Sequence, residues 1–130
     1  MTLLVSLVTP EREIWSGNAR RLIAKTLDGD IGILAGHAPV FGVLATGSLV
    51  RILAADGDEV SAAVSSGFLS VADDRVAVLA QQAQLGSEVD AQAVQSELES
   101  LLAESGPPGA GESAGVAYAR ALLRAAGQST

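Results

Sequence analysis

Hydrophobic residues in the first two thirds of the chain come in short runs that are separated by turn residues. Runs of this kind are typical of β-strands. Turn signals lie between the runs at intervals suited to hairpins, at Asp28-Gly29, Thr46-Gly47, Asp56-Gly57-Asp58 and Asp73-Asp74. The runs predict strands at Leu3–Val8, Arg20–Thr26, Ile31–Leu34, Val40–Ala45, Ser48–Ala54, Glu59–Ser65, Phe68–Val71 and Val76–Gln81. Many short strands at this spacing indicate an antiparallel β-sandwich or a flattened barrel.

The hydrophobic period changes after Gly86, where it becomes that of an amphipathic helix. Asp90 has the side chain of a helix N-cap, and the apolar residues after it recur on one helix face. These apolar residues are Val94, Leu98, Leu101 and Leu102. The pattern predicts a helix over Ala91–Glu104, which ends because the segment 105–111 is rich in Gly and Pro.

A second amphipathic helix is predicted to begin near Glu112 and to end at Gly127, a residue suited to a helix C-terminus. Its apolar side carries Val116, Ala119, Leu122, Leu123 and Ala126. Isolated helices of about 12–15 residues are marginal in water. The two helices therefore form a hairpin that either packs on the β domain or opens against a partner. We divide the chain into a β-sandwich domain at 1–86 and a helical domain at 87–130.

Composition and charge exclude several classes of protein. The 130 residues suit one domain with an appendage. A net charge of −7 with eight basic residues argues against a protein that binds nucleic-acid phosphates. The absence of Cys excludes disulfides and thiolate metal sites and fits a reducing compartment. The first residues lack the basic lead and the cleavage site of a signal peptide.

The stretch Ile31–Val50 carries no formal charge and has the length of a membrane-spanning helix, roughly 20 residues. Its glycines and Pro39 would break such a helix repeatedly. Two short strands joined at Thr46-Gly47 explain the stretch better. We therefore predict no spanning helix here.

Candidate chemistry centres on the segment Gly29–Pro39, which holds the only histidine of the chain, His37. Its glycines lack the Lys-Ser/Thr of a phosphate loop, and the sequence has no Gly-x-Ser-x-Gly nucleophile motif. His37 has no second His or Cys with which to hold a metal. The segment predicts tight backbone turns rather than catalysis or metal binding. A stand-alone β-sandwich that binds a small ligand and a small hydrolase that uses His37 stay open as alternatives.

Several segments of the β-rich part resemble one protein family. In order and spacing they are similar to the epsilon subunit of the bacterial F-type ATP synthase, and a two-helix tail is what that family has next. The resemblance covers nearly the whole chain and implies a sandwich of about ten strands. The segments that carry it are Gly29-Asp30-Ile31-Gly32-Ile33-Leu34-Ala35-Gly36-His37-Ala38-Pro39, Gly47-Ser48-Leu49-Val50, Ser65-Ser66-Gly67-Phe68-Leu69-Ser70-Val71, Val76-Ala77-Val78-Leu79-Ala80 and Val89-Asp90.

The resemblance implies a non-catalytic rotor subunit, peripheral to the cytoplasmic face of the bacterial plasma membrane, that holds no cofactor. It would join the gamma subunit to the ring of c subunits and turn with the central stalk during proton-driven ATP synthesis. In the family, the segments that match Asp30 and His37 lie at the end of the sandwich nearest the ring, where Asp30 would pair with a basic side chain. The residues that match this ring-facing part are Asp28, Gly29, Asp30, Gly36, His37, Ala38 and Pro39.

The helical tail resembles the regulatory element of the family, which folds onto the sandwich or extends along gamma and blocks ATP hydrolysis. Arg120 and Arg124, one helical turn apart, would then contact an acidic segment of the beta subunit. Some members bind ATP through a Leu/Ile-Asp-x-x-Arg-Ala motif, and this chain has Asp90 in place but Ala93 where the arginine stands. Loss of a guanidinium removes a charge-assisted hydrogen bond worth about 1.5–3 kcal/mol. We therefore expect weak or undetectable ATP binding.

Overall fold

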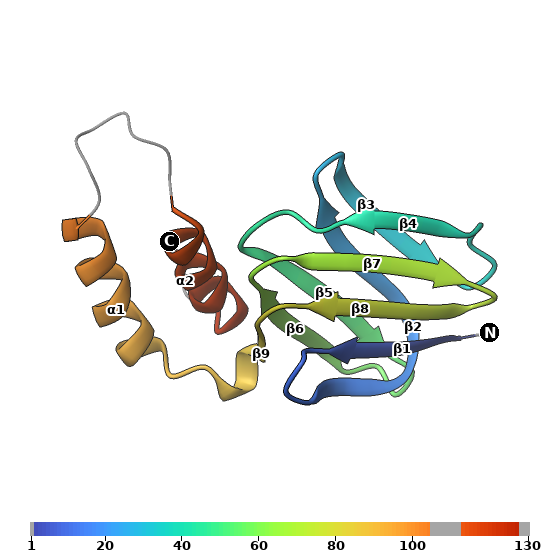
Figure 1. The fold of residues 1–130 in the computed structure, drawn as a ribbon. Helices are drawn as coiled ribbons and strands as arrows, with labels where there is room; N and C mark the ends of the chain where they lie inside the picture. Colours follow the sequence, from blue (N-terminus) through green and yellow to red (C-terminus); the bar gives the residue numbers. More distant parts are fainter. Residues whose placement is uncertain (1, 105–112, 128–130) are drawn as a thin grey trace.

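The computed structural model describes residues 2–104 and 113–127. Within them the chain forms nine β-strands, a short 3-10 helix and two α-helices (Figure 1). The strands are β1 (Leu3–Val8), β2 (Glu13–Thr26), β3 (Gly29–Leu34), β4 (Val40–Val43), β5 (Ser48–Ala54), β6 (Glu59–Val64), β7 (Gly67–Ala72), β8 (Arg75–Ala80) and β9 (Ala83–Leu85). The helices are η1 (Gly86–Glu88), α1 (Ala91–Glu104) and α2 (Ala114–Ala125). The prediction of a mainly β fold followed by two helices is confirmed.

The strands form one sheet that folds over on itself into two layers. The strand order is β4-β7-β8-β1-β2-β5-β6-β9, and β3 also pairs with β2. In Figure 1, β7, β8 and β1 lie in front of β2, β5 and β6. β2 belongs to both layers, because residues 13–19 pair with β1 and residues 21–26 pair with β3. Its register with β5 shifts between Ala19 and Arg21, and an irregularity of this kind bends a strand.

One strand pair departs from the antiparallel pattern that the hairpin signals predict. β1 and β8 lie parallel, with Val5 beside Val76 and Leu7 beside Val78. No turn joins β1 to β8, so the two strands are not held to the opposite directions that a tight hairpin imposes. The other strand pairs of the described residues are antiparallel.

The core lies between the two layers and consists mainly of aliphatic side chains. Alternate residues of a strand point inward, as in β1, where Leu3, Val5 and Leu7 are all 0% exposed. The same cluster includes buried residues of β2, β3, β5, β6, β7 and β8. Trp15 packs against its edge and is only partly buried. The alternation that predicted the strands is therefore the pattern that builds the core.

The structure extends the β pattern in two places. β2 begins at Glu13 rather than at Arg20, and β9 is an additional short strand. Gly17 and Asn18 interrupt the apolar alternation in the first part of β2, so the sequence pattern does not predict a strand there. β9 has three residues, which are too few to show a period.

Both α-helices begin after a residue whose side chain caps them. The Asp90 carboxylate accepts a hydrogen bond from the Ala93 backbone N–H at 3.1 Å. The Ser113 hydroxyl accepts one from the Val116 backbone N–H at 3.2 Å. Such bonds satisfy N–H groups that have no partner within the helix. The predicted cap of α1 is confirmed, and the cap of α2 is a serine that the sequence reading did not single out.

Other details of the second helix are partly as predicted. Gly127 follows α2 with a φ of 89°, the left-handed conformation expected of a terminating glycine. The predicted start near Glu112 lies outside the described residues. Ala126 comes after the helix and is only partly buried, whereas Ala121 is 0% exposed. On α1, Leu102 is 43% exposed, although the sequence pattern placed it on the apolar side of that helix.

The charge-free stretch 31–50 forms most of β3, all of β4 and the start of β5. This agrees with the prediction of short strands there. Within residues 2–104 and 113–127, no helix is long and apolar enough to cross a membrane.

Leu22→Ala is expected to lower the free energy of unfolding by about 2–5 kcal/mol, because Leu22 is 0% exposed and a cavity would remain in the core. Leu27→Ala makes the same change at a side chain that is 69% exposed, and a loss within about 0.5 kcal/mol is expected. Urea unfolding followed by circular dichroism measures both variants. Equal losses would contradict this account of the core.

Candidate functional site: an apolar sheet face and the hairpin junction

The outer face of β4, β7, β8 and β1 carries a continuous row of apolar side chains. Val43 of β4 lies beside Phe68 of β7, Phe68 lies beside Leu79 of β8, and Leu79 lies beside Val8 of β1. Phe41 adds a second ring, which stacks on Phe68 with the ring centroids 5.5 Å apart. Phe41 is 67% exposed, Leu79 51% and Phe68 46%. We call these five residues the apolar face.

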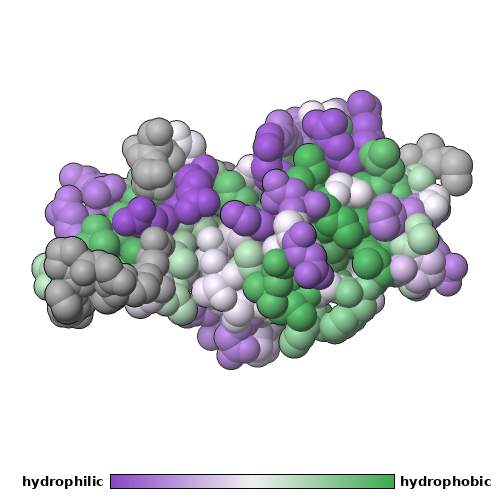
Figure 2. All heavy atoms as spheres, turned by 90° about the horizontal axis from the view of Figure 1, so that it is seen from above, coloured by the Kyte–Doolittle hydropathy of each residue, from purple (hydrophilic) through white to green (hydrophobic). Residues whose placement is uncertain are grey.

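A groove of about 570 Å³ borders the apolar face. Its lining includes Val8, Val43, Phe68 and Leu79 of that face, together with the exposed side chain of Leu27. Figure 2 shows hydrophobic residues gathered over the sandwich half of the molecule, with hydrophilic residues between the patches. Contiguous apolar surface of this kind marks sites where proteins bind one another. The sequence analysis did not identify this face, because which side of each strand lies outward is decided by how the strands pair.

The segment 29–39 forms β3 and the loop that follows it. Asp28 belongs to the turn between β2 and β3, Gly29 is the first residue of β3, and Asp30 lies opposite Lys25. Gly36 comes after the other end of β3, with a φ of 87°. At about 3.3 Å per residue, the two groups are separated by the length of the strand, roughly 17 Å. The structure therefore does not bring Asp30 and His37 together, although the resemblance implied one end of the sandwich.

The loop after β3 is held by a residue distant in sequence. The Gly36 N–H donates a hydrogen bond to the Asp74 carboxylate at 2.6 Å, and the Asp74 carbonyl accepts one from Leu4 at 2.8 Å. Asp74 has a φ of 60° in the turn between β7 and β8. One residue thus joins that turn to β1 and to the loop. No local signal in the sequence points to this role, since Asp74 reads only as part of a turn.

His37 is partly buried in this loop. Its Nδ1 lies 2.7 Å from the Ala38 carbonyl oxygen, and its backbone N–H donates to Leu34. A carbonyl oxygen only accepts hydrogen bonds, so this contact requires the proton to be on Nδ1. Ala38 and Pro39 are exposed. The contact holds the imidazole ring against the backbone of its own loop and fixes its tautomer.

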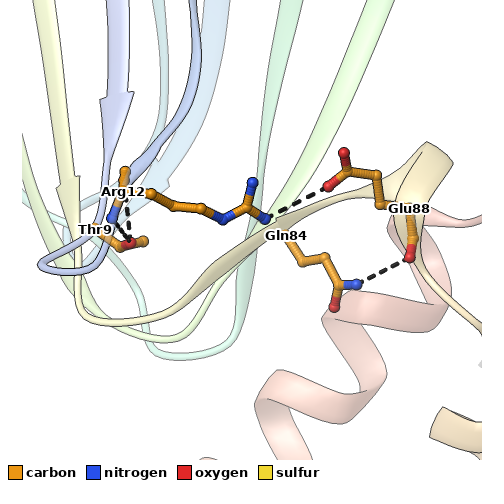
Figure 3. Close-up of polar contacts among 4 residues, drawn as sticks. All are labelled: Thr9, Arg12, Gln84 and Glu88. Atoms are coloured by element: carbon orange, nitrogen blue, oxygen red, sulfur yellow. Dashed lines mark hydrogen bonds and ion pairs between the residues drawn. The ribbon is translucent and has the colours of Figure 1, made fainter.

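A second polar group joins the sandwich to the helical hairpin, as Figure 3 shows. Arg12, in the turn between β1 and β2, lies 3.6 Å from the Glu88 carboxylate of η1. Gln84 of β9 donates its side-chain N–H to the Glu88 carbonyl oxygen at 2.9 Å, and Thr9 donates to the Arg12 carbonyl at 3.2 Å. Both charged side chains are about half exposed, and exposed ion pairs contribute only about 0–1 kcal/mol. The group orients the linker more than it stabilises the fold.

The two arginines predicted on the second helix have different surroundings. Arg120 is partly buried, whereas Arg124 is exposed in the last turn of α2, where a cation is favoured by the helix dipole. Arg124 lines a polar cleft of about 360 Å³ between α2 and the outer face of β2, β3 and β5. The other charged residues of its lining are Lys25, Asp30 and Arg51. On the same helix, burial raises the pKa of Tyr118, which therefore stays neutral at pH 7.

A sequence model described as the β-sandwich domain of the ATP synthase delta/epsilon chain matches residues 2–86. The ATP synthase epsilon chain of Thermobifida fusca (strain YX) is 50% identical over 127 residues, which cover 95% of this chain and 91% of that one. The chain belongs to the epsilon-chain family of ATP synthase. The epsilon chain of Streptomyces avermitilis is 47% identical over 102 residues, covering 78% of this chain and 82% of the relative.

Solved structures with the same fold come from larger ATP synthase assemblies. A chain of the Euglena gracilis mitochondrial ATP synthase, in a structure of OSCP, F1 and the c-ring, has a TM-score of 0.71 at 22% identity. The match covers 94% of this chain and 75% of that one. A chain from the central stalk and c-ring of the Tetrahymena thermophila enzyme has a TM-score of 0.56 at 18% identity, with coverage of 97% and 91%. At these identities the likeness shows the shared fold.

The position of the epsilon-family ATP motif is occupied by the cap of α1. Asp90 directs its carboxylate to the Ala93 N–H, and both residues are exposed. A methyl group at Ala93 offers no hydrogen bond to a phosphate. The expectation of weak ATP binding therefore stays a prediction.

Asp74→Ala is expected to speed amide hydrogen exchange at Gly36, because it removes the acceptor of the Gly36 N–H. A net hydrogen bond of about 0.5–1.5 kcal/mol corresponds to roughly a 2- to 10-fold faster exchange. Asp73→Ala is the matched control, since Asp73 lies in the same turn with a φ of 52°. Exchange measured by NMR should change at Gly36 in the first variant alone. The same acceleration in both would contradict a specific role for the Asp74 carboxylate.

Proposed function

We propose that this chain is a non-catalytic rotor subunit of a bacterial proton-translocating F-type ATP synthase. It binds the gamma subunit, joins the central stalk to the c-ring, and is held peripherally at the cytoplasmic face of the plasma membrane. Membership of the epsilon-chain family supports the assignment. The single structural observation that carries it is the apolar face, since a rotor joint needs a large complementary surface more than a catalytic group.

The apolar face is the proposed contact with gamma. It crosses four strands of one layer, and its side chains sit on a stiff sheet, so little ordering is needed on binding. Full burial of a Phe or Leu side chain is worth about 1.5–3 kcal/mol. Three exposed side chains, Phe41, Phe68 and Leu79, thus provide the central anchors of the interface.

The proposed contact with the c-ring runs along β3. Asp28, Gly29 and Asp30 lie near its first residue, and Gly36, His37, Ala38 and Pro39 lie beyond its last. Because the strand separates the two groups, the contact follows the side of the sandwich rather than a single loop. Asp30 is exposed and provides the acidic partner for a basic side chain of the ring.

The helical domain at 87–130 is the proposed regulator of ATP hydrolysis, and the domain at 1–86 is the proposed anchor. In the state described here, α2 rests against β5 and β6. When the hairpin extends, Arg120 and Arg124 face an acidic segment of the beta subunit, where guanidinium groups pair with carboxylates.

A ligand-binding role for a stand-alone sandwich is the competing function. The stacked rings of Phe41 and Phe68 form the exposed aromatic platform that such a role requires. Small-ligand sites bury most of the ligand in a cleft with several polar groups. The apolar row instead crosses four strands as an exposed face, which suits a protein partner.

Phe68→Arg is expected to weaken binding to purified gamma roughly 10- to 100-fold, because it places a charge at the centre of the apolar face and removes an anchor of about 1.5–3 kcal/mol. Leu34→Arg is the control for gamma binding alone, since Leu34 is 60% exposed on β3, which lies outside this face but along the proposed contact with the c-ring. Co-purification and calorimetry with gamma and detergent-solubilised c-ring measure the effect. If the unaltered chain bound neither partner, the rotor function would be wrong. If both variants bound gamma normally, the assigned surface would be wrong.

Deletion of residues from Asp90 onward is expected to leave gamma binding intact and to raise the ATP hydrolysis rate of the assembled complex. The reason is that the deletion removes the proposed inhibitory hairpin and leaves the apolar face untouched. Hydrolysis is measured on complexes that contain the full or the shortened chain in equal amount. Unchanged hydrolysis would show that the hairpin is not inhibitory in this protein.

A further inference from the structure

Helix α2 rests on the sandwich and on the linker at two points where backbone meets backbone. At Gly47, a Cβ atom would lie 2.3 Å from the carbonyl carbon of Ala117. At Gly86, a Cβ atom would lie 2.0 Å from the carbonyl oxygen of Ala125. Atoms that are not bonded pack at about 3.5–4.0 Å, so neither position has room for any side chain. Both contacts exist because the residues are glycines.

The two contacts lie on one face of α2. Ala117, Ala121 and Ala125 are four residues apart, a spacing that aligns side chains along a helix. Ala121, between the two contact points, is 0% exposed. Beneath the helix, the paired residues Leu49 of β5 and Ala63 of β6 belong to the hydrophobic cluster of the hairpin. The helix therefore fits the sandwich closely through small residues.

The hairpin and the sandwich have separate cores. The sandwich cluster is built from strand residues and Leu44, whereas the buried hairpin cluster includes Ala63 as its residue from the strands. The extended contact of α1 is with α2, so the position of α1 follows that of α2. The nearby Arg12 and Glu88 pair is exposed and weak. The hairpin can thus leave the sandwich without opening the sandwich core.

We propose that Gly47 and Gly86 form a two-point steric seat that sets the docked position of the hairpin. A side chain at either glycine pushes α2 away and shifts the chain toward the undocked state. This inference rests on the proposed function for its consequence, because the undocked hairpin is the proposed inhibitor of ATP hydrolysis. The steric seat itself does not depend on that function and can be tested on the isolated chain.

The two glycines differ in a way that separates the seat from a simple backbone effect. Gly47 has a φ of 62°, so an alanine there is strained even without α2. Gly86 is not among the positive-φ glycines, so an alanine there meets only the Ala125 backbone. Two other glycines are matched controls. Gly57 has a φ of 97° with open space around it, and Gly32 has open space without a positive φ.

The test uses the full chain, which has no native Cys, so two introduced cysteines take nitroxide labels uniquely. Ser16→Cys on β2 and Ser100→Cys on α1 place the labels on exposed positions. Pulsed electron–electron double resonance then reports the distance between sandwich and hairpin. In the parent and in the Gly57→Ala and Gly32→Ala variants, one narrow docked distance is expected. In Gly47→Ala and Gly86→Ala, loss of most of that docked population is expected.

Slow amide exchange at Val50 and Ile52, which are 0% exposed, shows whether the sandwich stays folded in each variant. If Gly47→Ala unfolds the sandwich, Gly86→Ala alone tests the steric seat, because an alanine at position 86 introduces no backbone strain. Retention of the docked distance in Gly86→Ala would overturn the proposal. Its loss in Gly57→Ala or Gly32→Ala to the same extent would overturn it as well.

Hydrolysis assays on the assembled complex separate the seat from the regulatory role. If a variant undocks in the isolated chain and its complex hydrolyses ATP more slowly, the result supports both the steric seat and the regulatory function. A variant that undocks without any change in hydrolysis leaves the seat standing and contradicts the regulatory function. A variant that stays docked contradicts the seat, whatever its effect on hydrolysis.

Discussion

The passage of β2 from one layer to the other is the constraint on which the rest of the structure depends. Its first half pairs with β1 and its second half with β3 and β5, with a register shift near Arg20. A single hydrogen-bonded strand thereby ties the two faces of the core together. The parallel pairing of β1 with β8 then links the first and last parts of the sandwich. Aliphatic side chains fill the space that these pairings enclose.

A sandwich held together by these strand pairings can present apolar side chains to solvent without rearranging to bury them. Phe68 and Leu79 stay exposed on the outward side of strands whose inward residues include Leu69 and Val78, both 0% exposed. Phe41 lies on the outward side of β4, whose inward residues are partly buried. Successive side chains of a strand point to opposite faces of the sheet, so the same alternation places one residue in the core and the next on the surface. A rigid sandwich suits the proposed role as a joint in a rotor, because such a joint transmits torque through the fit between the surfaces in contact. Catalytic groups are not needed for that task.

The hairpin is attached to this body by contacts of another kind. Small residues and two glycines let α2 approach the sandwich closely, and the polar group around Glu88 orients the linker. Close packing of small side chains depends steeply on fit but buries little apolar area. A contact of this type is specific in position, which suits the proposed role of the hairpin as a movable regulatory element.

Periodicity along the sequence determined most of the strands, both helices and the cap at Asp90, because each of these depends on residues close together in the chain. It did not reveal the first half of β2, where Gly17 and Asn18 break the alternation, nor the parallel direction of β8. From the sequence, the candidate site could be predicted only as a set of residues, without their positions relative to one another. Tertiary structure alone decided that Asp30 and His37 lie at opposite ends of β3, that Asp74 holds Gly36, and that α2 sits on Gly47 and Gly86. The contacts of Asp74 with Gly36 and of α2 with Gly47 and Gly86 join residues tens of positions apart, and only the folded chain brings these residues within contact distance.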